Sequence, residues 1–110
     1  MSKDNTFEAP ETAEQRVVRL LKTNGPDDAE AKQALLDWTI ARETAVEQSP
    51  DPEGGIKLNL ERGRMYLSAG YVDEAFDNFT SALLQAWLEG REIWRAIEEE
   101  IEGIAAFAGK

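Results

Sequence analysis

Apolar side chains recur along this chain at the spacing of an amphipathic α-helix, and polar residues fill the positions between them. Thr12 opens a capping-box pattern and predicts a helix that stops at residues 24–26, which read Asn-Gly-Pro. Either Asp27 or Asp28 is expected to cap a second helix that runs to about Gln48. Its apolar stripe comprises Ala31, Leu35, Trp38 and Ala45, with Leu36 and Ile40 beside it.

The strongest break in the pattern is residues 49–55, which hold two prolines and two glycines and predict a loop between helices. A third helix is predicted over residues 56–69, and Asp73 lies in the first turn of a fourth. The fourth helix either ends at Gly90 or bends there, because a single glycine inside a helix costs only about 1 kcal/mol. Isoleucines at helical spacing then predict an amphipathic closing helix, and these are Ile93, Ile97, Ile101 and Ile104.

The fold class that follows is all-α, with about five helices. Two antiparallel helix hairpins are expected to stack, and the C-terminal amphipathic helix is expected to cap them. Residues 1–11 are polar and show no period, which predicts a flexible N-terminal tail. Residues 12–110 then form one helical domain, long enough to bury roughly two-thirds of the surface of its unfolded chain.

Small and aromatic residues follow one another at fixed spacing in the middle of the chain. The spacing reads Gly63-x2-Tyr66-x3-Gly70-x4-Ala75-x3-Phe79-x2-Ala82. This segment resembles a tetratricopeptide repeat, whose pattern contains G-x2-Y followed by A-x3-F in an antiparallel helix pair. Three residues depart from that family's pattern, in place of its Trp, Leu and Pro respectively: Asn59, Arg62 and Trp87.

The resemblance implies a domain of the tetratricopeptide type that binds other proteins. Such repeats generally need at least three copies to bury a continuous core, whereas this chain has length for two pairs and one further helix. Two solutions remain open: the closing helix completes the core, or a second copy of the chain does.

Composition narrows the classes of partner. The chain has 110 residues, is 42% hydrophobic and carries a formal net charge of −10. This charge argues against nucleic acid and against anionic membrane surfaces, and it leaves a basic protein partner as an option. No apolar run approaches the roughly 20 residues of a membrane span, and the first residues lack the pattern of a secretion signal. We therefore expect a cytoplasmic protein.

Catalytic and metal-binding chemistry has little support in the sequence. There is no histidine and no cysteine, so the usual general base and the commonest soft or borderline metal ligands are missing. Glu98, Glu99, Glu100 and Glu102 form an acidic cluster, but adjacent residues of a helix point in different directions and do not converge. We expect no enzyme activity, no cofactor and no metal site.

The resemblance also implies a binding surface, because the first helix of each pair usually lines the groove in this family. Carried to this chain, Lys57 and Arg64 share a face and can grip a carboxylate, such as a peptide terminus. The alternative is that they are ordinary surface charges paired with Glu53 and Glu61. The expected partner-binding set is Lys57, Leu60, Glu61, Arg64, Leu67 and Ser68.

Tryptophans offer a second candidate surface. Trp38, Trp87 and Trp94 each lie on or near an apolar stripe, which favours a role in the core. Trp87 and Trp94 are also seven residues apart, about two helical turns, and flank Gly90. The alternative is therefore a partly exposed aromatic pair that contacts a partner or a second copy.

The function that these patterns favour is a non-catalytic protein–protein interaction module, an adaptor or chaperone-like domain that holds a peptide or helix of another protein. The alternative is a structural, self-assembling helical protein that forms a homodimer through its C-terminal helix.

Overall fold

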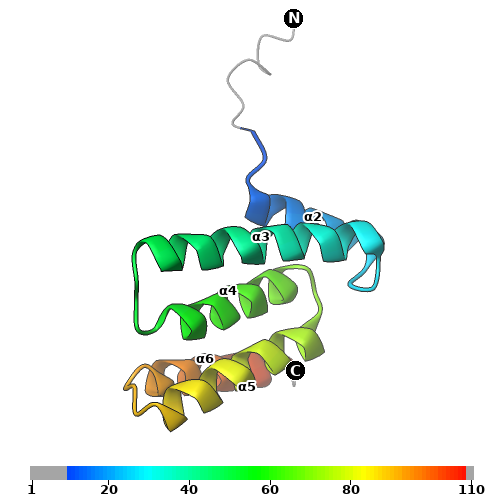
Figure 1. Ribbon diagram of the computed structural model, residues 1–110. Helices are drawn as coiled ribbons and strands as arrows, with labels where there is room; N and C mark the ends of the chain where they lie inside the picture. Colours follow the sequence, from blue (N-terminus) through cyan, green and yellow to red (C-terminus); the bar gives the residue numbers. More distant parts are fainter. Residues whose placement is uncertain (1–9, 109–110) are drawn as a thin grey trace, which may run out of the picture.

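The structure is a computed structural model that describes residues 10–108 (Figure 1). Within that range it is all-helical, with five helices and no strand, which confirms the predicted fold class. The helices are α2 (Ala13–Asn24), α3 (Ala29–Gln48), α4 (Gly54–Ser68), α5 (Val72–Leu88) and α6 (Trp94–Ala108). Most of the predicted N-terminal tail, residues 1–9, lies outside the described residues.

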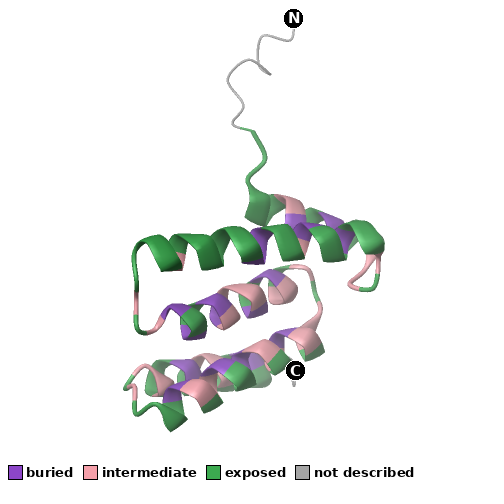
Figure 2. Cartoon of the chain, in the orientation of Figure 1, coloured by how far each residue is buried: buried purple, intermediate pink, exposed green. Residues whose placement is uncertain are grey.

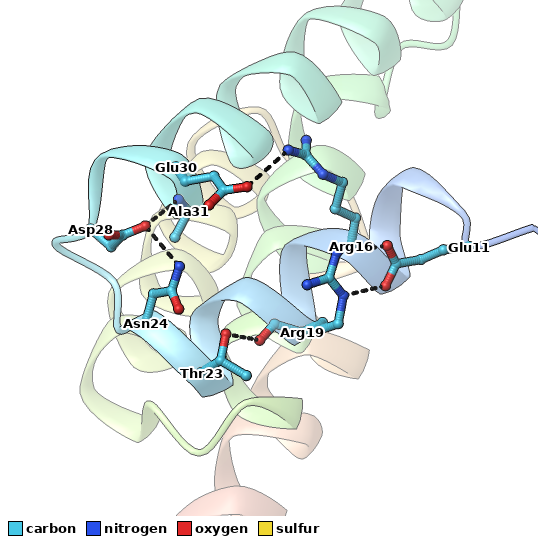
Figure 3. A network of polar contacts seen from close by, with 8 residues as sticks. All are labelled: Glu11, Arg16, Arg19, Thr23, Asn24, Asp28, Glu30 and Ala31. Atoms are coloured by element: carbon cyan, nitrogen blue, oxygen red, sulfur yellow. Dashed lines mark hydrogen bonds and ion pairs between the residues drawn. The ribbon is translucent and has the colours of Figure 1, made fainter.

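Local hydrogen bonds cap the N-termini of α2 and α3. Thr12 and Gln15 exchange side-chain hydrogen bonds with each other's backbone amides at 3.0 and 2.9 Å, so the predicted capping box is confirmed. Asp28, one of the two predicted caps, accepts a hydrogen bond from the Ala31 amide at 3.0 Å (Figure 3). That bond, with one from Asn24, lowers the pKa of the Asp28 carboxyl group below its usual value.

Residues of α2 also form ion pairs, but these pairs are exposed to solvent. Arg19 pairs with Glu11 at 2.7 Å, and Arg16 reaches Glu30 of α3 at 3.5 Å (Figure 3). Exposed pairs of this kind contribute little to stability, because solvent screens them. Apolar packing therefore holds α2 against α3.

The first core cluster lies where α2 and α3 meet α4. Tyr71 closes its edge, because its hydroxyl group donates a hydrogen bond to the Leu21 carbonyl oxygen at 3.0 Å. The bond links the segment before α5 to the last turn of α2. The buried residues of this cluster are Val17, Leu20, Leu21, Ala31, Ala34, Trp38, Leu58 and Met65.

The second core cluster lies between α4, α5 and α6. Phe79 is fully buried at its centre, and α4 and α5 make the most extensive helix–helix contact in the described chain. Since α4 contributes to both clusters, it lies between the N-terminal helices and α5 (Figures 1 and 2). The buried residues of this cluster are Ile56, Leu60, Ala75, Phe79, Ala82, Ala86, Ile97 and Ile104.

Two glycines end helices in the same way. Gly70 and Gly90 have positive φ angles of 94° and 68°, and the residue after each one donates a hydrogen bond back into the preceding helix. In the second case the Arg91 amide bonds the Ala86 carbonyl oxygen at 2.9 Å. The two options at Gly90 are thereby resolved, because α5 ends before it.

The second half of α3 departs from the predicted stripe. There Ala45 is exposed and Ile40 is about half exposed, whereas in the first half Ala34 is buried and, of the large apolar residues, only Leu36 is about half exposed. The reason is length, because α3 has 20 residues and α2 only 12, so the end of α3 has no part of α2 to cover it.

Gly63 provides a test of the contact between α4 and α5. A Cβ atom at Gly63 would lie 3.3 Å from the Ala75 carbonyl oxygen and 3.3 Å from the Phe79 ring. Gly63→Leu is therefore expected to lower the free energy of unfolding by about 2 kcal/mol through overpacking. The matched control is Gly103→Leu on α6, where no atom lies within 4 Å and the better helix former should be neutral or stabilising. Urea unfolding followed by circular dichroism measures both, and equal effects would contradict the assigned contact.

Candidate functional site

Leu60, expected to contact a partner, belongs to the core. It is 4% exposed and packs in the second cluster with residues of α5 and α6. The prediction that Leu60 lines a groove is therefore wrong. The physical reason is that α4 has apolar neighbours on both sides, so its apolar positions are covered.

The two cations of the predicted groove are engaged within the chain. Lys57 lies 2.9 Å from Asp51 and 4.0 Å from Glu53, so one of the alternative pairs is present. The hydrogen bond to Asp51 raises the pKa of the Lys57 ammonium group. The Lys57 side chain thus links α4 to the loop that precedes it.

Arg64 is held by α6. Its Nε and Nη2 atoms donate to the two carboxylate oxygens of Glu100 at 2.9 and 2.8 Å, which raises the pKa of the guanidinium group. Glu61, the alternative partner of Arg64, instead accepts from Arg42 of α3 at 2.7 Å. A carboxylate of a peptide would have to displace Glu100 to reach Arg64.

The remaining two residues of the set lie in different hollows. Leu67 is half-buried in a hollow of about 470 Å³ that it shares with the last turns of α6, including Ile104 and the exposed Phe107. Ser68 borders a hollow of about 720 Å³ formed mainly by α2. The structure therefore divides the predicted set and forms no single groove from it.

Trp87 and Trp94 do come together, across the turn from α5 to α6. Their rings meet edge to face, with centroids 5.3 Å apart and an interplanar angle of 80°. Trp87 is 61% exposed, so the interpretation that places it in the core is wrong, whereas Trp38 is 5% exposed and confirms that interpretation. The guanidinium carbon of Arg95 lies 5.5 Å from the centre of the Trp94 ring, close enough for a cation–π contact.

Exposed leucines extend this pair into a larger surface, which we call the Trp patch. Leu84 and Leu88 are 56% and 74% exposed, and they lie one turn apart on α5. A hollow of about 330 Å³ opens between α5 and α6, with Glu98 at its rim. The apolar residues of the Trp patch are Leu83, Leu84, Trp87, Leu88 and Trp94.

The helical pattern alone does not identify Leu84 and Leu88 as surface residues, but a second signal does. The face of α5 that meets α4 carries mainly small residues, among them Ala75, Ala82 and Ala86. Together with Phe79 these residues fill that face, so the larger apolar residues beside it are left to the outer side of α5. The size of the side chains thus indicates which of the two apolar faces points outward.

Local contacts shift the pKa values of some titratable groups within residues 10–108. Where pKa values shift, hydrogen bonds lower those of Glu11 and Asp51, and burial raises that of the Tyr66 hydroxyl group. Each group moves further from neutrality. The same residues form no acidic cluster able to hold a metal ion.

None of the described helices is long and apolar enough to cross a membrane.

A scan against models of protein families and searches of curated proteins and solved structures found no match to this chain. The support for the Trp patch as a candidate binding site therefore comes from its geometry alone.

Removing each of two tryptophans should affect stability very differently. Trp38→Ala is expected to lower the free energy of unfolding by about 3–5 kcal/mol because it leaves a cavity in the first core cluster. Trp87→Ala should lower the free energy of unfolding by about 1 kcal/mol, mostly because the edge-to-face contact with Trp94 is lost. Urea unfolding followed by circular dichroism measures the free energy of unfolding of both variants. A loss at Trp87 as large as that at Trp38 would mean that Trp87 is a core residue.

Proposed function

We propose that this chain is a non-catalytic protein–protein interaction module, an adaptor or chaperone-like domain, which binds a helix or peptide of a partner protein at the Trp patch. One observation carries the proposal: Leu84, Trp87 and Leu88 are all more than half exposed and lie beside the hollow between α5 and α6.

The energetics favour a partner on this surface. Covering a side chain of this size contributes about 1.5–3 kcal/mol, and the Trp patch leaves three of them largely in water. Tryptophan is enriched among the residues that dominate binding energy, because it buries a large area at little conformational cost. A contiguous exposed apolar surface beside a hollow is typical of protein-binding sites.

The order of helix contacts is compatible with tetratricopeptide-like stacking, which we retain as part of the proposal. In this view α2 with α3 and α4 with α5 form two hairpins, and α6 caps them. The proposed site then lies on the second helix of a pair and on the cap, away from the first-helix groove that the resemblance implies. Because Lys57 and Arg64 already hold Asp51 and Glu100, a carboxylate-terminated partner loses support.

A homodimer is the second candidate, since two copies of the Trp patch can cover each other. The α6 residue Phe107 is 79% exposed and adds apolar area near the C-terminus. Against it stands the formal net charge of −10 that each copy brings. Like charges facing each other oppose association.

Site-specific photo-crosslinking tests the proposal. A benzophenone amino acid at Leu88 should give adducts of discrete mass when the protein is irradiated in the extract of its own cells. The reason is that a side chain at this position of the Trp patch lies within reach of a bound partner. The same probe at Leu36, an exposed leucine on α3, is the matched control and should give none.

The mass of the adduct separates the two candidates. An adduct with a different protein that disappears in the Trp87→Ala background supports the interaction module, and an adduct of two copies supports the homodimer. Equal labelling from Leu36 and Leu88 would contradict a specific role for the Trp patch.

A further inference from the structure

We infer that the occupant of the Trp patch is a cationic amphipathic helix, which places apolar residues on the tryptophans and basic residues on the carboxylates of α5 and α6. This inference rests on the proposed function, because it names the partner of the same site. Charge complementarity and the size of the patch support it.

The two helices that carry the patch, with the turn between them, hold most of the chain's net negative charge. Residues 72–108 contain nine acidic residues and two arginines, which leaves −7 of the formal net charge of −10. Both arginines are already engaged, Arg91 at 3.8 Å from Glu89 and Arg95 over the Trp94 ring. The local field therefore favours a positive partner.

Carboxylates flank the apolar residues of the Trp patch at positions where they can meet basic residues of a bound helix. Glu98 lines the hollow, Glu102 follows one turn later on α6, and Asp77 precedes Thr80 by one turn on α5. Within residues 10–108, none of these three carboxylates takes part in an ion pair, in contrast to Glu100, which Arg64 neutralises. They are thus open to the cations of a partner.

The length of the patch fits two turns of helix. Thr80 and Leu88 are eight residues apart, which spans ~12 Å at a rise of about 1.5 Å per residue. An amphipathic helix presents anchors at positions i, i+3, i+4 and i+7 over a similar length, and such helices lay their apolar face into hydrophobic grooves. A second copy fits less well, because it brings the same carboxylates to the contact.

Three synthetic peptides of about 18 residues test the inference. All carry leucine at i, i+3, i+4 and i+7, lack tryptophan, and differ only in whether the polar positions hold Lys, Gln or Glu. Fluorescence anisotropy of the labelled peptides gives the dissociation constants. The Lys peptide is expected to bind about tenfold more tightly than the Gln peptide at low salt, and added salt should remove much of that difference.

Variants of the protein separate the apolar contribution from the charge. Trp87→Ala should weaken binding of the Lys peptide about tenfold. Replacing Glu98 and Glu102 by Gln should weaken the Lys peptide several-fold and leave the Gln peptide unchanged. The matched controls on α3 are Leu36→Ala and the pair Glu43→Gln with Glu47→Gln, and neither should change binding.

Each other outcome has a definite meaning. If the Gln or Glu peptide binds as tightly as the Lys peptide and still depends on Trp87, the inference fails and the proposed function stands. If the α3 charge pair matters as much as Glu98 with Glu102, binding is non-specific attraction and the inference also fails. If no peptide binds in a Trp87-dependent way, both are overturned, and a dimer in sedimentation equilibrium that Trp87→Ala abolishes would assign the patch to a second copy.

Discussion

The close approach of α4 and α5 at Gly63 is the constraint on which the rest of the structure depends. Without a side chain at Gly63, the Phe79 ring and the Ala75 carbonyl group come within contact distance of α4. This contact lets α4 serve two core clusters at once, with Met65 in the first and Leu60 in the second. A wider separation would open the second cluster, on which α6 also packs.

Helix positions were predictable because their signals are local. The Thr12 capping box, the Asp28 cap and the two glycines that end α4 and α5 each act within a few residues. The spacing of Gly63, Ala75 and Phe79 also predicted a helix–helix contact, because a close approach needs small residues at fixed intervals. These features required no knowledge of distant parts of the chain.

The candidate site was only partly predictable because exposure depends on what covers each face. Trp87 and Trp94 were identified as a pair from their spacing, but the pattern could not decide whether Trp87 is buried. Arg64 has its partner 36 residues away, in Glu100, and no local pattern shows that pair. Leu60 was misplaced for a related reason, since a periodic pattern does not show that both sides of α4 are covered.

The Trp patch follows from the same constraint that builds the core. Ala75, Phe79, Ala82 and Ala86 fill the buried face of α5, and Leu84, Trp87 and Leu88 lie outside it. The adjoining α6 covers them only in part, since it turns back at Gly90 and brings Trp94 edge to face with Trp87. Glu98 of α6 lines the hollow beside what remains exposed. Stable packing of α4 on α5 and an exposed apolar surface are therefore two consequences of one arrangement of small and large residues.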